Sequence, residues 1–298
     1  MGDRSRREND PKATLYLLGT GTPTPTPSRF GTAYVLQLGR DYLMVDCGPA
    51  ATHKLVKAGL FPTQIDFLFF THHHFDHNAD YPCFLLSRWD QSTGKENRLH
   101  VRGPEPTRLI TERLIGSQGA FVFDWKARVG DPTSQRVHVN RGGTLPRPEP
   151  SVDVEDVGPG KVTEHSGWSV MAAAAHHAEP WLQSLAYRVE CPEGTIVFAG
   201  DTGPPESLGG LTHGADVLVV NCWDHQQAMD ENGEAPGQTG TLDAARMAKE
   251  ACAGRLVLTH VGPSLCAPGS GEQAIKDIAS IYDGTVIFGE ELMRLPLW

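Results

Sequence analysis

The 298-residue chain has no run of apolar residues long enough to cross a membrane, which takes about 20 residues in a helix. Its first eleven residues are hydrophilic and contain no apolar stretch like that of a secretory signal peptide. These absences predict a cytoplasmic protein, with residues 1–11 as a disordered arm and residues 12–298 as one domain. A signal peptide removed from a longer precursor would leave no trace in this sequence.

An excess of basic residues is also absent. The chain contains 26 lysines and arginines against 36 aspartates and glutamates, which gives a formal net charge of −10. Proteins that hold a polyanion usually carry a basic excess or a clustered basic patch. Only Arg4, Arg6 and Arg7 gather in this way. The balance argues against nucleic acid as the main partner and favours a small-molecule substrate; it is compatible with a homodimer.

The cysteines form no Cys-x-x-Cys pair. They are spread along the whole chain, at Cys47, Cys83, Cys191, Cys222, Cys252 and Cys266. A chain of this length can bury a core without disulfides, and several of the six lie beside apolar segments, where free cysteine behaves as a small hydrophobe. We therefore predict reduced thiols.

A complete dinucleotide-binding fingerprint is missing too. Residues 13–18 read as a strand and lead into Gly19-Thr-Gly-Thr, but Thr24 stands where the third glycine would be. The prolines at positions 23, 25 and 27 exclude the helix that such a site needs. The segment is predicted to be a rigid, extended loop.

The densest chemical signal that is present is a histidine-rich segment. The mainly apolar residues 65–70 read as a buried strand, and His72, His74, Asp76 and His77 follow directly. Alternate side chains of an extended segment point the same way, so His72 and His74 can act together. Imidazole and carboxylate groups suit zinc and related divalent ions. A solvated histidine-rich loop is the alternative, but the carboxylate in the pattern favours a metal site.

Later predicted strands also lead into polar side chains. The apolar segments 169–175, 195–199, 215–220 and 256–259 are followed by His176-His177, Asp201, Asn221 and His260, respectively. Helical patterns at residues 50–58 and 242–251 alternate with the strands. This order is typical of a layered α/β protein, in which chemistry gathers at the carboxyl ends of strands.

Three motifs resemble those of a known family. The pattern His72-x-His74-x-Asp76-His77 resembles the signature of the metallo-β-lactamase superfamily, and Asp46-x-Gly48 resembles its first motif, where a carboxylate supports the metal site. The Gly19-to-Pro27 segment resembles the opening of the ribonuclease Z-like branch, which also contains arylsulfatases and chlorothalonil dehalogenase. The resemblance implies an αββα sandwich, with two β-sheets face to face and helices outside.

The resemblance also implies a binuclear zinc site with two Zn²⁺ per chain. The first metal would take His72, His74 and a histidine of the 176–177 pair, for which His177 is preferred and His176 is the reserve. The second would take Asp76, His77 and His260, and Asp201 would bridge the two. A metal pair lowers the pKa of a bridging water, which supplies hydroxide as the nucleophile. Asp76 could also accept a proton from that water.

The segment after residues 215–220 departs from ribonuclease Z, because Asn221-Cys-Trp-Asp-His225 replaces that enzyme's His-Glu-Ala-Thr. Asn221 could donate a hydrogen bond to substrate, Trp223 could stack on an aromatic ring, and His225 could protonate a leaving group. Trp223 could equally pack in the core. We therefore predict a hydrolase for a small, aromatic substrate, acting by dehalogenation or by aryl ester or sulfate hydrolysis. The alternatives are a phosphodiesterase or ribonuclease Z-like nuclease, a lactonase or thioesterase, and a non-catalytic metal-binding protein.

Residues 89–160 show weak periodicity and are predicted to form an irregular insert, with a helix at residues 106–116. Within it Phe121, Phe123 and Trp125 alternate, as on one face of a strand. Core packing is the preferred explanation of these three aromatics, and a substrate-pocket wall is the alternative.

Overall fold

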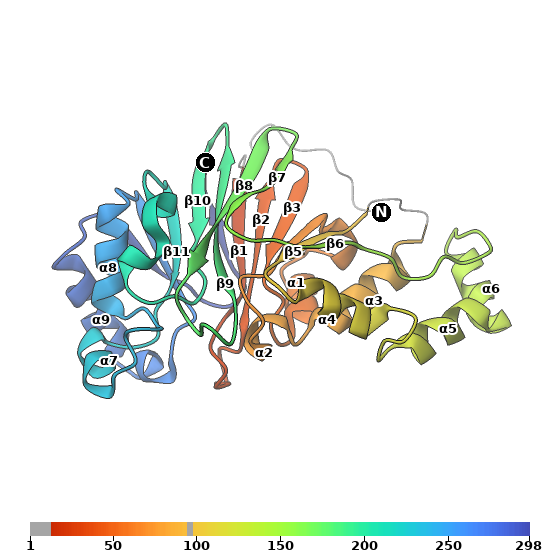
Figure 1. Ribbon diagram of the computed structural model, residues 1–298, viewed down its shortest axis with the longest axis horizontal. Helices are drawn as coiled ribbons and strands as arrows, with labels where there is room; N and C mark the ends of the chain where they lie inside the picture. Colours follow the sequence, from red (N-terminus) through yellow and green to blue (C-terminus); the bar gives the residue numbers. More distant parts are fainter. Residues whose placement is uncertain (1–12, 94–97) are drawn as a thin grey trace.

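The computed structural model describes residues 13–93 and 98–298, so the predicted arm at residues 1–11 lies outside the described residues. Two seven-stranded sheets pack face to face (Figure 1). The first sheet has the order β14-β1-β2-β3-β4-β5-β6, formed by Met293–Pro296, Ala13–Thr20, Thr32–Leu38, Asp41–Val45, Phe67–Phe69, His100–Gly103 and Asp153–Asp156. The second has the order β13-β12-β11-β10-β9-β8-β7, formed by Thr285–Phe288, Arg255–Thr259, Val217–Asn221, Gly194–Phe198, Ser184–Cys191, Trp168–Ala175 and Gly160–His165.

The two sheets repeat one pattern of strand directions. Strands β1, β2 and β3 are antiparallel, whereas β3 to β6 run parallel. In the second sheet β7 to β10 are antiparallel and β10 to β13 run parallel. Because carboxyl ends of parallel strands meet at the same edge of a sheet, each half presents one edge for chemistry. The prediction of two similar halves is confirmed.

The core between the sheets is built from alternate side chains of the strands. On β1, Leu15 and Leu17 face the opposite sheet, whereas Tyr16 and Leu18 pack with the residues of the covering helices. All eight residues of β1 are buried, because a strand covered on both faces is apolar throughout rather than alternating. This burial explains the continuous apolar runs in the sequence.

Helices cover the outer faces of both sheets (Figure 1). The first sheet is covered by α1, α3 and α4, at Ala51–Lys57, Tyr81–Gln91 and Thr107–Ile115; the second is covered by α8 and α9, at Thr241–Glu250 and Ser270–Ala279. The predicted αββα sandwich is confirmed. The longest helix of the described part, α3, has 11 residues, and no described helix meets the length and hydropathy needed to span a bilayer. All six cysteines are free, as predicted.

The predicted irregular character of residues 89–160 is wrong. Strands β5 and β6 extend the first sheet there, and the segment also holds α4, α5 (Val122–Gly130) and α6 (Pro132–Asn140). The predicted helix at residues 106–116 is confirmed as α4. Strands of four residues are too short to show periodicity, which is why the sequence did not reveal them.

The alternating aromatics of this segment lie on a helix, not on a strand. Trp125 is buried on α5, while Phe123 is 85% exposed. Phe121 precedes the helix by one residue, so it lies four positions before Trp125, one helical turn away. Three alternating positions cannot separate a strand from the first turn of a helix. The core explanation holds for Trp125 alone.

Candidate metal centre

The histidine-rich segment leaves the carboxyl end of β4 and enters one turn of helix. His72 and His74 lie in the loop after the strand, and Asp76 and His77 lie in α2 (Phe75–Asn78). His72, Asp76 and His77 are almost fully buried. The turn of helix brings Asp76 and His77 back toward the site, so four potential ligands gather within six residues.

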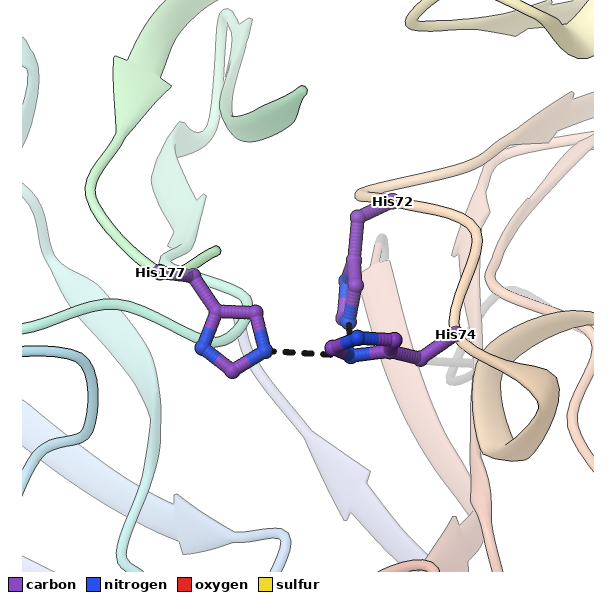
Figure 2. Close-up of side chains that lie close together, drawn as sticks. All are labelled: His72, His74 and His177. Carbon is purple, nitrogen blue, oxygen red and sulfur yellow. Dashed lines mark hydrogen bonds between the residues drawn. The ribbon is translucent and has the colours of Figure 1, made fainter. Parts of the chain in front are cut away.

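Three histidines form the first group of ligand atoms (Figure 2). His72 Nε2 lies 3.0 Å from His74 Nδ1, and His177 Nε2 lies 3.1 Å from the same His74 atom. His177 follows β8 of the second sheet, so this group joins the two halves of the molecule. Among the described residues, the group contains His177 and not the exposed His176.

Asp76, His77 and His260 form the second group. His260 follows β12, and its Nε2 lies 3.1 Å from Asp76 Oδ2; His77 Nε2 lies 3.5 Å from the same oxygen. Asp201, which follows β10, lies between the two groups. Its Oδ2 is 3.3 Å from His260 Nε2 and 3.8 Å from His177 Nε2. The structure thus brings together all seven side chains that the sequence selected as metal ligands.

Burial and the neighbouring charges shift the pKa values of these groups in different directions. Burial lowers the pKa of His72 well below its ordinary value, which leaves the neutral imidazole that a metal requires. Burial alone would raise the pKa of Asp201, but His260 and His77 hold it well below its ordinary value. Burial alone would lower the pKa of His77, but Asp201 and Asp46 outweigh this effect and raise it well above. The carboxylates therefore favour positive charge at this place.

Buried polar atoms that have no hydrogen-bond partner test whether these residues fit a metal ion. Asp76 Oδ1, His77 Nε2 and His260 Nδ1 are buried without a hydrogen-bond partner. Buried polar atoms without partners are rare, because each costs free energy of desolvation. All three residues belong to the second group, in which His77 Nε2 is left free because Nδ1 lies 2.8 Å from Asp46 Oδ2. A donor set of imidazoles and carboxylates with free lone pairs fits zinc.

The comparisons with known proteins agree with this geometry. A sequence profile described as "Metallo-beta-lactamase superfamily" matches residues 26–260, a range that includes both ligand groups and Asp201. The chain belongs to the metallo-β-lactamase superfamily. The prediction of a hydrolase of this superfamily is therefore confirmed. The identity of the metal and of the substrate is proposed below.

Relatives of the superfamily resemble the chain over almost its full length. A protein named "Ribonuclease Z" from Mycobacterium sp. (strain KMS) is 30% identical over 291 residues, 94% of this chain and 95% of the relative. Two solved structures share the fold at 21% identity, each covering 96% of this chain and 99% of their own. They are the metallo-β-lactamase fold protein YhfI from Bacillus subtilis, with a TM-score of 0.71, and the short form of human tRNase Z, with a TM-score of 0.68.

A buried carboxylate supports the centre from behind. Asp46 Oδ2 lies 2.8 Å from His77 Nδ1, and the same carboxylate accepts hydrogen bonds from the Thr71 backbone N–H and hydroxyl, both at 2.8 Å. Gly48 allows this arrangement, because a Cβ there would collide with the carbonyl oxygen of Asp76. The superfamily's Asp-x-Gly step therefore orients His77 and packs the backbone against α2.

We predict that Asp46→Asn weakens metal binding by about 10- to 100-fold, the usual effect of removing such a supporting carboxylate. The variant loses the charge that fixes which ring nitrogen of His77 carries the proton. Competition with a metal chelator measures the affinity. Asp153→Asn is the matched control, because Asp153 pairs with His100 Nδ1 at 2.7 Å on β5 and β6, outside the centre. Equal losses in the two variants would contradict the supporting role.

The remaining predicted site residues lie in two different places. Asn221 lines a small cavity together with His77 and Asp201, but its Nδ2 already donates to Gln238 Oε1 at 3.0 Å. The half-buried Trp223 ring lies 6.0 Å from the His260 ring, so it borders the centre rather than the core. His225 instead faces α9, with Nε2 2.9 Å from Ser270 Oγ and Nδ1 3.5 Å from Asp277.

The contacts of Asn221 and His225 limit the roles predicted for them. A substrate would compete with Gln238 for the amide of Asn221. Neither ligand group of the described residues includes His225, and its ring nitrogens both face α9. No contact therefore supports its predicted role as proton donor to a leaving group.

Sequence reasoning missed the loop that holds His177. The carbonyl oxygen of Gly237 lies 2.8 Å from His177 Nδ1, so it accepts the proton there and leaves Nε2 free as a ligand atom. The same loop carries Gln238, which binds Asn221, and the Thr239 carbonyl, which accepts from the Trp223 backbone N–H at 2.9 Å. Backbone carbonyls leave no signal in a sequence, so no pattern could have found this support.

Proposed function

We propose that this chain is a binuclear zinc-dependent hydrolase that cleaves phosphodiester bonds. The observation that carries the proposal is the position of Asp201 between two complete groups of ligand atoms, one from His72, His74 and His177 and one from Asp76, His77 and His260. A non-catalytic metal-binding protein has no need of such a pair. The choice of bond is supported by the relatives named ribonuclease Z.

The seven side chains would hold two zinc ions, with Asp201 shared between them. When bound, such a pair lowers the pKa of water and stabilises the negative charge that develops on a phosphate. The protein's own contribution is orientation. The Gly237 carbonyl and Asp46 each fix one ring nitrogen of a histidine, so that the other nitrogen points into the centre. Asp76 Oδ1, which has no partner, is the atom placed to accept a proton released during the reaction.

The net charge of the chain favours a small substrate, whereas the names of the relatives favour RNA. A net charge of −10 argues against a long polyanion, whereas the relatives named ribonuclease Z count against our prediction that nucleic acid is not a partner. A short phosphodiester reconciles the two, because a dinucleotide or cyclic nucleotide needs no extended basic surface.

A second candidate is the aromatic substrate predicted from the sequence, cleaved at an aryl ester, aryl sulfate or carbon–halogen bond. The observation that favours it is Trp223, whose ring lies beside His260 at the edge of the centre. The names of the relatives give no support to dehalogenation. No contact among the described residues favours a lactonase or thioesterase.

A substrate panel tests the proposal. Zinc-reloaded protein is assayed with bis(p-nitrophenyl) phosphate, a 2′,3′-cyclic nucleotide and a tRNA precursor, and then with p-nitrophenyl sulfate, p-nitrophenyl acetate and a chlorinated aromatic nitrile. We expect the highest kcat/KM for the phosphodiesters, and loss of that activity after removal of the metal. Turnover of the sulfate or the nitrile without any phosphodiesterase activity would replace the proposal by the second candidate.

A further inference from the structure

Two large aromatic side chains are exposed in the segments that carry His74 and His177. Phe75 is 55% exposed and Trp181 is 91% exposed, whereas the other five tryptophans are buried or half-buried. An aromatic side chain of this kind normally buries about 150–250 Å². An exposed ring therefore contributes much less hydrophobic stabilisation to the folded protein. Both residues lie close in the chain to a predicted metal ligand.

Chain connectivity places these aromatics on opposite sides of the centre. Phe75 directly follows His74 and begins α2, on the side of the first sheet. Trp181 lies four residues after His177, on the side of the second sheet, and its backbone N–H donates to the Ala178 carbonyl at 3.0 Å. That turn keeps the two Cα atoms within about 7 Å, so Trp181 stays near His177.

The two histidines themselves meet across the sheets. The ring centres of His74 and His177 are 4.9 Å apart, and Figure 2 shows them approaching from different parts of the chain. The segments that carry Phe75 and Trp181 therefore meet at this pair of histidines. The exposed ring on each segment offers a flat apolar surface, which suits a planar π system.

We propose that Phe75 and Trp181 form a subsite that stacks on a planar aromatic ring of the substrate, next to the anionic group held at the metal centre. This subsite rests on the proposed function, because the anionic group of the substrate is taken to be a phosphate. The ring could belong to a nucleobase or to an aryl ester. Trp223, on the His260 side, borders the centre separately and keeps its Nε1 bound to Glu234 Oε2 at 2.8 Å.

Calorimetric titration of the zinc-reloaded protein tests the subsite without relying on turnover. Adenosine 5′-monophosphate is compared with ribose 5-phosphate, and phenylphosphonate with methylphosphonate, so that each pair differs by a ring. Stacking on one base changes affinity by about 5- to 100-fold. We expect at least one ring-bearing ligand to bind more tightly by that factor. Trp181→Ala and Phe75→Ala should remove most of the preference, and Trp181→Phe should keep it.

Phe61→Ala is the matched control, because Phe61 is 57% exposed but precedes β4, at the opposite end of that strand from the ligands. Equal binding within both ligand pairs, or an equal loss in the Phe61 variant, would overturn the subsite. The two proposals can fail separately. If both aromatic variants lose the ring preference but the protein cleaves no phosphodiester, the proposed function is refuted and the subsite remains supported. The pair with the larger preference identifies the ring as nucleobase or aryl group.

Discussion

Asp201→Asn is expected to lower kcat/KM by about 10³-fold or more, the equivalent of several kcal/mol of lost charge stabilisation. The carboxylate lies between the two ligand groups, and both of its oxygens face imidazoles: Oδ1 is 3.6 Å from His77 Nε2 and Oδ2 is 3.3 Å from His260 Nε2. Asparagine has the same shape, but it carries no charge and replaces one of these oxygens by an amide nitrogen. Asp201 also forms a further group of possible ligand atoms with His72 of the first group and His77 of the second.

Kinetics on the best substrate of the panel, together with metal analysis, measures this effect. The thermal unfolding temperature of the metal-free variant is the control for folding. We expect the variant to remain folded, since asparagine keeps the volume and His77 and His260 keep Asp46 and Asp76 as carboxylate partners. Full activity with two bound metals in Asp201→Asn would refute the bridging role.

His260→Asn is expected to lower the saturating zinc content from two ions per chain to one, and to reduce activity heavily. His260 has a backbone φ of 49°, in the left-handed region that asparagine tolerates better than most residues do. Asparagine therefore keeps the backbone and removes Nε2, the atom that faces Asp76 and Asp201. The strand β12 before it is buried through its apolar side chains and does not depend on the imidazole.

Metal content after reloading, measured beside kcat/KM, checks this second prediction. His213→Asn serves as the matched control, because His213 is exposed and belongs to neither ligand group. Retention of two zinc ions by the His260 variant would contradict the role of His260 as a ligand, and a saturating content of one ion in the unmodified protein would contradict a binuclear centre.

The sequence by itself determined the fold class and the grouping of the first four predicted ligands. His72, His74, Asp76 and His77 lie within six residues directly after a buried strand, and such short-range geometry depends on local backbone structure. The alternation of apolar strands with amphipathic helices likewise predicted a layered α/β protein, because each element must bury one face against another.

Only the tertiary structure decided how the distant parts of the chain meet. The choice of His177 over His176, and the place of Asp201 between both groups, depend on packing between two sheets whose residues lie more than 100 positions apart, as for His74 and His177. The same holds for Asp46 behind His77 and for the Gly237 carbonyl behind His177. The exposure of Trp181 and the burial of Trp125 are also tertiary properties. A side chain's identity states which contacts it can make, whereas its neighbours in the folded protein decide which of them it does make.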